Sequence, residues 1–261
     1  MSRFAPLRAG ETMADTHLGE AIVRVEGAVK EYPFGPGIIR ALDGVTLAVP
    51  RGRMTALLGP SGSGKTVLLN LISGLEQPDR GRVLVEGRDL GRMTTRQLTA
   101  NRRSTIGFVF QGFNLIPNLS ALENIMLPLE FAGVSERESL RQAREMLAAV
   151  GLAARASHTP PQLSGGEQQR VAIARALAND PPILLADDPI GNVDSQLGGE
   201  IVGILRQMAD RGKTVVVAGH HAAIEEAADE VVYFRDGRIE RVWNARAAQR
   251  VSESGRGGNR P

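Results

Sequence analysis

Apolar residues follow two patterns along this chain, and the two patterns alternate. Helical spacing is clearest where Leu197, Ile201, Leu205 and Met208 fall on one face of a helix. Short, mostly apolar runs are typical of strands buried on both faces of a parallel sheet, and they cover residues 54–58, 106–110, 183–186 and 213–218. Strands that alternate with helices predict an α/β fold with a mainly parallel sheet.

The first fifty residues have a different pattern. Residues 22–26 and 45–49 alternate between apolar and polar positions, as half-buried strands do. A Gly35-Pro36-Gly37 turn separates them, and residues 82–87 form a further short strand. These features predict an antiparallel β subdomain. Asp236-Gly237 also marks a hairpin between residues 231–234 and 238–242.

Residues 112–162 carry helical signals and few strand signals. Ser135 followed by Glu138 predicts a capping box, and Gly151 ends the helix that follows. We therefore expect a helical subdomain at about 112–162, inserted into a core and antiparallel β subdomain at about 20–111 and 163–245. The tails at 1–19 and 246–261 lack periodicity and are expected to be disordered.

Composition narrows the possible classes of protein. Hydrophobic residues make up 42% and charged residues 23%, which is ordinary for a globular domain. The absence of cysteine excludes disulfides and thiolate chemistry. A net charge of +2 gives little reason to expect nucleic acid as a partner. No signal peptide or membrane span is evident, so we expect a cytoplasmic protein whose membrane association is peripheral.

One glycine-rich segment between a strand and a helix carries the clearest chemistry. It has the G-x-x-x-x-G-K-[ST] pattern of a phosphate-binding loop. Its backbone N–H groups and the helix N-terminus favour an anion. Lys65 is expected to reach the β- and γ-phosphates of a nucleoside triphosphate, and Thr66 to hold Mg²⁺. The segment consists of Gly59, Pro60, Ser61, Gly62, Ser63, Gly64, Lys65 and Thr66.

Two carboxylates follow the apolar run at 183–186. Asp187 and Asp188 then lie at the carboxyl end of a central strand, where α/β sheets bind ligands. Asp187 is the expected magnesium ligand, and Asp188 is placed to orient or deprotonate an attacking water. The alternative is an ordinary acidic turn before Pro189.

A second glycine-containing segment, Ser164-Gly165-Gly166, opens another helix and offers a second anion site. The alternative is a flexible helix cap. One nucleotide cannot easily use two such helix ends of one chain, so the pair suggests that two copies of the chain sandwich the nucleotide.

These motifs, in their order and spacing, resemble the ATP-binding-cassette (ABC) ATPases over about residues 22–243. The resemblance implies a P-loop NTPase fold with a RecA-like core, ATP and Mg²⁺ as cofactors, and a homodimer. Tyr32 corresponds to the aromatic residue that stacks on adenine, and Gln111 to the glutamine that touches Mg²⁺ and senses a membrane partner. Strand-edge packing for Tyr32 and a polar strand end for Gln111 remain alternatives.

The same resemblance assigns roles near the γ-phosphate. His220 matches the switch histidine beside the attacking water, with a surface-loop histidine as the alternative, and would act with Asp188 and Lys65. Ser164, Gly165 and Gly166 would grip the nucleotide of the opposite subunit, with Asp194 in the loop that crosses the interface. Val67 and Glu167 complete the expected nucleotide-binding set.

Residues 106–117 and 123–129 narrow the resemblance to the bacterial branch with lipoprotein-release, macrolide-export and cell-division cassettes. That branch acts with an integral membrane permease, expected here to contact residues 111–117 at the cytoplasmic face of the membrane. Phe113, Leu115 and Ile116 are candidate docking points, and core packing is an equal alternative for each.

The departures from the family pattern concern hydrolysis. Asp188 stands where the family usually has glutamate, and Ile190 where it usually has threonine. Gly219 and His221 replace the usual threonine and aspartate around His220. A carboxylate withdrawn by about 1 Å can slow a reaction about 100-fold, so we expect slow or partner-dependent hydrolysis.

The resemblance implies the ATPase subunit of a bacterial transporter. The alternatives are a cassette that works a permease mechanically to regulate envelope enzymes and a hydrolysis-impaired regulatory cassette. A cassette protein acting on ribosomes or DNA is disfavoured, because this chain has one cassette and a short insertion.

Overall fold

The computed structural model describes residues 21–244, and the two tails expected to be disordered lie outside the described residues. A six-stranded sheet forms the centre, in the order β10-β9-β3-β8-β7-β6. Its members pair in parallel except for the antiparallel hairpin β9–β10. They are β3 (Met54–Leu58), β6 (Ile106–Val109), β7 (Ile183–Asp187), β8 (Thr214–Gly219), β9 (Glu230–Arg235) and β10 (Arg238–Asn244). The expected α/β fold with a mainly parallel sheet is confirmed.

A second, antiparallel sheet has the order β2-β1-β4-β5. The short strands expected near its start are two continuous strands of 14 residues each, which accommodate several bulges in their pairing. Bulges break the strict alternation of apolar positions, so the sequence pattern showed only part of each strand. The four strands are β1 (Ala21–Phe34), β2 (Gly37–Pro50), β4 (Arg80–Val85) and β5 (Arg88–Asp89).

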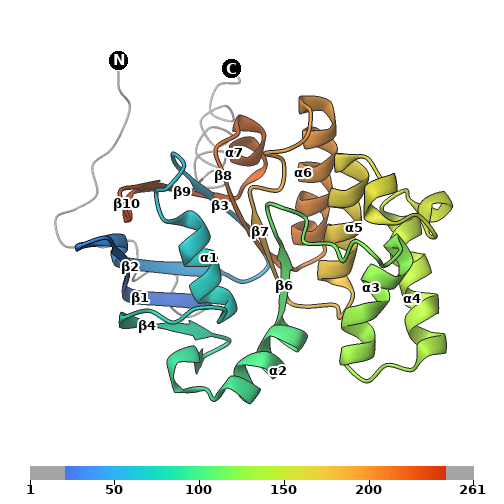
Figure 1. Ribbon diagram of the computed structural model, residues 1–261. Coiled ribbons are helices and arrows are strands. Elements are labelled where there is room, and N and C mark those ends of the chain that lie inside the picture. Colours follow the sequence, from blue (N-terminus) through green and yellow to red (C-terminus); the bar gives the residue numbers. More distant parts are fainter. Residues whose placement is uncertain (1–20, 245–261) are drawn as a thin grey trace, which may run out of the picture.

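Helices cover both faces of the parallel sheet (Figure 1). α1 (Lys65–Ser73) lies between the two sheets, and its Leu68 and Leu69 share a core with β1, β2, β4 and one face of the parallel sheet. The other face packs against α5 (Gly165–Leu177), α6 (Ser195–Asp210) and α7 (Ala222–Ala227). This arrangement leaves the carboxyl ends of β3, β7 and β8 at one edge of the molecule, together with the N-terminus of α1.

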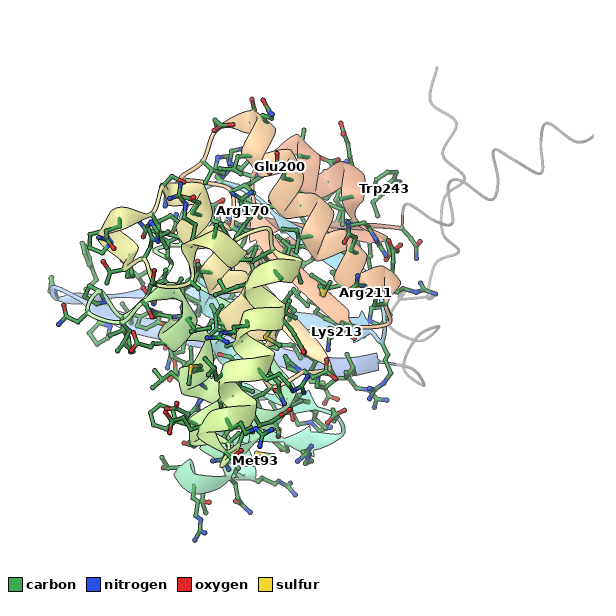
Figure 2. The ribbon with its side chains drawn as sticks, turned by 90° about the vertical axis from the view of Figure 1, so that its right-hand side faces the viewer. Met93, Arg170, Glu200, Arg211, Lys213 and Trp243 are labelled. Atoms are coloured by element: carbon green, nitrogen blue, oxygen red, sulfur yellow. The ribbon has the colours of Figure 1, made fainter. Side chains whose placement is uncertain are left out.

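The helical region has its own core. α3 (Ala121–Phe131) and α4 (Glu136–Ala149) pack with one side of α5, which contributes Val171 and Ala174. An ion pair of 3.1 Å between Arg170 of α5 and Glu200 of α6 lies beside this contact (Figure 2). α5 thus joins the helical region to the parallel sheet, and the subdomain boundary near residue 162 stays a prediction.

Two local expectations were incomplete or wrong. The sequence reading did not foresee α2 (Thr95–Thr105), which a Thr94–Gln97 capping box opens. The capping box expected at Ser135 does not form, because Glu138 instead accepts hydrogen bonds from Arg141 and Gln142. Three short 3₁₀ turns complete the description, at Leu90–Arg92, Ala153–Arg155 and Pro160–Gln162.

Within residues 21–244, none of the helices is long and apolar enough to cross a bilayer.

Candidate functional site

The glycine-rich loop between β3 and α1 is held by close backbone contacts. A Cβ at Gly59 would lie 2.2 Å from the Phe234 carbonyl oxygen, and one at Gly64 would lie 2.4 Å from the Ala41 carbonyl oxygen. Gly64 also has a φ of 104°, which L side chains rarely adopt. Only glycine therefore fits at these two positions, so the loop geometry depends on both.

Lys65 lies inside the curl of this loop. Its Nζ donates to the carbonyl oxygens of Gly59 and Pro60, both at 2.8 Å, and to Ser63 Oγ at 3.2 Å. Partial burial lowers the pKa of Lys65, and the nearby Asp187 and Asp188 carboxylates oppose that shift. The ammonium is thus positioned by neutral acceptors, which a phosphate oxygen could replace with a stronger, charge-assisted bond.

Asp187 ends β7 beside the start of α1. Its Oδ1 accepts a hydrogen bond of 3.0 Å from the Thr66 hydroxyl. Burial raises the pKa of Asp187, the Thr66 hydrogen bond lowers it, the neighbouring Asp188 charge raises it, and Lys65 lowers it. A buried carboxylate beside a hydroxyl is a hard-oxygen donor set, which suits Mg²⁺.

Asp188 is held in an unusual backbone conformation, with a φ of 42°. Its N–H donates to the Ala218 carbonyl at 2.9 Å, and its Oδ2 accepts from Gln111 Nε2 at 3.2 Å. A Cβ at Gly191 would lie 2.3 Å from Oδ2. The carboxylate is therefore packed against Gly191, so a side chain at position 191 would force the Asp188 carboxylate to move.

The segment after β8 brings His220 to the same place. His220 Nδ1 lies 3.8 Å from Asp188 Oδ1, with the histidine side chain 56% exposed and the aspartate 17% exposed. Gly219, one of the departures from the family pattern, is closely packed, because a Cβ there would lie 2.6 Å from Ile224 Cδ1 and would require that side chain to shift. Ile190, another departure, is buried in the core beneath α6.

Tyr32 lies on β1 at the far side of the loop. Its hydroxyl donates to Glu76, which also accepts from Asn70 at 2.8 Å. Burial and the hydrogen bond to Glu76 raise the pKa of Tyr32. Lys30 Nζ lies 5.5 Å from the Tyr32 ring centroid. Glu76 was not foreseen from the sequence, since no motif marks it.

These elements enclose a cavity of about 370 Å³, within the size range of small-molecule sites. Twelve of the expected site residues line it, together with Gly219, which the sequence had marked only as a departure from the family pattern, and Ala41, which was not foreseen. Ala41 comes from β2 and carries no polar signal. The twelve are Tyr32, Ser61, Gly62, Ser63, Gly64, Lys65, Thr66, Val67, Gln111, Asp187, Asp188 and His220.

The second glycine-containing segment does not line this cavity. Ser164 and Glu167 form a capping box at the start of α5, with Ser164 N–H donating to Glu167 at 2.8 Å. A Cβ at Gly166 would lie 1.8 Å from Leu197 Cδ2, so this glycine allows α5 and α6 to pack closely. Asp194 caps α6 by accepting from Leu197 N–H at 3.0 Å. Gly165 lies near the Asn192 carbonyl.

The cavity fits a magnesium nucleoside triphosphate. Its loop offers N–H groups at a helix N-terminus together with Lys65, which suits phosphates. The Thr66–Asp187 pair lies beside them, where a cation bridging phosphate oxygens would be needed.

Comparison with known proteins agrees with this geometry. The family described as "ABC transporter" matches residues 42–191. The LolD 2 ATP-binding protein of a lipoprotein-releasing system, from Caulobacter vibrioides, is 44% identical over 224 residues, covering 85% of this chain and 98% of the relative. The macrolide export ATP-binding/permease protein MacB of Chromobacterium violaceum is 42% identical over 232 residues, covering 89% of this chain but 36% of the relative.

A solved structure agrees as well. The post-hydrolysis dimer of the ATP-binding cassette MJ0796 of Methanocaldococcus jannaschii, bound to ADP and Pi, has a TM-score of 0.81 and 44% identity, covering 85% of this chain and 98% of that chain. The expected resemblance is thus confirmed, including the lipoprotein-release and macrolide-export relatives. The chain therefore belongs to the ABC transporter family, as an ATP-binding cassette with the P-loop NTPase fold.

Proposed function

We propose that two copies of this chain close on two MgATP molecules and drive a membrane permease, and that ATP hydrolysis resets them. The observation that carries this proposal is that the glycine-rich loop lines the same cavity as Asp187, Asp188, Gln111 and His220. The dimeric state of the MJ0796 cassette supports the pairing of two copies.

Within one chain, different residues are proposed to bind the phosphates, to hold the metal and to position the attacking water. Lys65 exchanges its loop carbonyl acceptors for oxygens of the β- and γ-phosphates. Thr66 and Asp187, with Gln111 beside them, would hold Mg²⁺, which would neutralise charge on these phosphates when bound. Asp188 and His220 line the same cavity as Lys65 and would hold the attacking water between them, with Asp188 as general base.

The remaining site residues are proposed to act on the other copy. Ser164, Gly165, Gly166 and Glu167 do not line the cavity of their own chain, so we assign them to the γ-phosphate of the nucleotide bound by the partner copy. Asp194 would lie at the same interface. Tyr32, positioned by Glu76, would stack on the adenine.

The test is the Mg²⁺-dependent ATPase rate and the oligomeric state of the full chain. We expect hydrolysis that Asp188→Asn abolishes, with Asp188→Asn forming an ATP-dependent dimer in size-exclusion chromatography. His158→Asn serves as the control, because His158 does not line the cavity. Hydrolysis that persists in Asp188→Asn would contradict the assignment of Asp188.

The permease contact is proposed at residues 111–117, at the cytoplasmic face of a bacterial membrane. This loop is braced, since Asn124 accepts from Ile116 N–H at 2.8 Å and Arg175 donates to the Phe113 carbonyl at 2.8 Å. Ile116 is 40% exposed, whereas Leu115 packs against the helical core. Ile116 is therefore the stronger docking candidate.

This contact is tested by recovering the tagged chain from detergent-solubilised membranes. We expect a permease to co-purify with the wild-type chain and to be lost with Ile116→Glu. Recovery of the same permease with both proteins would rule out Ile116 as a docking point.

A slowly hydrolysing, regulatory cassette is the second candidate function. The observation that favours it is Asp188, whose short side chain is held by Gln111 and packed against Gly191. We expect Asp188→Glu to raise the steady-state ATPase rate about tenfold or more, since a displacement of about 1 Å can change rates about 100-fold. No gain with the permease present would show that Asp188 does not limit hydrolysis.

A further inference from the structure

Two histidines and a carboxylate meet beyond the carboxyl ends of β7 and β8. One ligand atom from each of Asp188, His220 and His221 lies within 4.8 Å of the other two. The parallel pairing of β7 with β8 continues into this segment, where Asp188 N–H donates to the Ala218 carbonyl. The three side chains are thus brought together by the sheet itself.

Two polar atoms of this cluster have no hydrogen-bond partner among the described residues. Asp188 Oδ1 and His221 Nε2 are both buried and unpaired. A buried polar atom without a hydrogen-bond partner destabilises the folded state, so such atoms call for an explanation. A shared cation would explain both, because it takes electron pairs from a carboxylate and from an imidazole at once.

The two imidazoles are also arranged as neighbouring ligands. Their ring centroids lie 4.1 Å apart with the planes inclined by 35°. His221 is the N-cap residue of α7, yet its side chain makes no capping hydrogen bond. Its ring is therefore not engaged in the role that usually selects a residue for this position.

The chemistry of the ligands indicates which cation would bind. Zinc takes imidazole nitrogens and carboxylate oxygens in a tetrahedron, where neighbouring ligand atoms are about 3.4 Å apart. The distance from His220 Nδ1 to Asp188 Oδ1 is 3.8 Å, and the three ligand atoms lie within 4.8 Å of one another, so the side chains must draw closer together when a metal binds. Mg²⁺ prefers oxygen ligands and is directed instead to Thr66 and Asp187.

We propose that Asp188, His220 and His221 form a zinc-type transition-metal site, which stops the cassette from hydrolysing ATP when it is loaded. The bound metal would occupy the carboxylate oxygen and the imidazole that otherwise hold the attacking water. Inhibition rests on the proposed function, whereas metal binding does not. His221, which replaces the usual aspartate of the family, is the residue that creates the site.

The metal site is tested with Co²⁺ on the full, tag-free chain without nucleotide. We expect visible d–d bands that saturate at one Co²⁺ per chain and disappear when Zn²⁺ is added. His221→Gln should weaken binding about tenfold or more, since each ligand contributes strongly to affinity. His158→Gln makes the same chemical change away from the cavity and should bind as the wild type does.

The contradicting results are equally specific. Absence of the bands, or equal loss in His221→Gln and His158→Gln, would overturn the site. Since the spectra need no ATP, they show whether the metal site exists even if the chain proves to have no ATPase activity.

Inhibition is measured separately, as the MgATPase rate against added Zn²⁺, with each variant normalised to its own zinc-free rate. His221→Gln should need about ten times more Zn²⁺ than the wild type for half inhibition, in line with its weaker binding. Equal sensitivity of the two proteins would overturn the inhibitory role.

Discussion

Two helices of this cassette begin with glycine-containing turns, yet their N-termini differ in charge and hydrogen bonding. α1 is capped by Gly64, without a side-chain cap and without an acidic residue in its first turn. α5 is capped by Ser164, and its first turn carries Glu167, which also pairs with Arg155 at 3.0 Å. The N–H groups of α1 are therefore open to an external anion, whereas α5 already holds a carboxylate of its own.

The difference favours the N-terminus of α1 over that of α5 as an independent phosphate site. The hydrogen bond from the Ser164 N–H lowers the pKa of Glu167, which therefore stays ionised at the α5 end. α1 instead adds Lys65, a positive charge, to the field of its own N-terminus. We infer that α1 binds the nucleotide within one chain, and that α5 contributes only when a second copy aligns it.

Among substitutions that test the difference between the α1 and α5 N-termini, Lys65→Ala should have the largest effect, and that effect is on ATP affinity. Loss of its charge-assisted bonds to phosphate removes about 1.5–3 kcal/mol, so ATP should bind about 10–100-fold more weakly. Titration with a fluorescent ATP analogue measures this affinity. Lys213→Ala is the matched control, because Lys213 pairs with Asp180 at 2.6 Å away from the cavity. Unchanged affinity in Lys65→Ala would remove the distinction between the two helix ends.

A smaller effect is expected from Ser164→Ala, and it should fall on hydrolysis alone. The ATPase rate at saturating ATP should drop about tenfold or more, as when one charge-stabilising donor is removed, while ATP binding by the single chain stays the same. Ser120→Ala removes an equivalent capping box from α3, so both variants should lose about 1 kcal/mol of stability. Equal loss of ATPase activity in Ser164→Ala and Ser120→Ala would show that Ser164 acts only as a helix cap.

The smallest expected effect is that of Asp187→Asn on the melting temperature and on its dependence on pH. Burial raises the pKa of Asp187 above its ordinary value, so ionising it favours the unfolded state as pH rises through the folded-state pKa. Asp187→Asn should therefore melt at a higher temperature than the wild type at pH 7 without Mg²⁺. The difference should vanish at a pH below the ordinary aspartate pKa, where the wild-type carboxyl is protonated in both states. A lower melting temperature at pH 7 would contradict this account.

The sequence predicted the strands and helices whose apolar pattern is strong. It missed α2, because Leu98 is its only buried apolar residue, although the Thr94–Gln97 capping signal was present. It also predicted a capping box at Ser135 that does not form, because Glu138 pairs with Arg141 instead.

The site was predictable where a motif is continuous in sequence, as in the glycine-rich loop. It was not predictable where separate strands meet. The approach of His221 to Asp188 depends on the pairing of β7 with β8, and the contact of Tyr32 with Glu76 joins β1 to the segment after α1. Neither pair is marked by spacing along the chain.

The most direct test of the two-copy site is to mix the impaired Lys65→Ala and Ser164→Ala chains in equal amounts, at an ATP concentration where each alone retains about a tenth of the wild-type ATPase rate or less. In a twofold-symmetric dimer, each mixed pair has one site with an intact Lys65 and an intact Ser164 from the other copy. Random pairing should therefore restore about a quarter of the wild-type ATPase rate. If Lys65 and Ser164 instead served the same nucleotide within one chain, the ATPase rate of the mixture would equal the average of the rates of its two components.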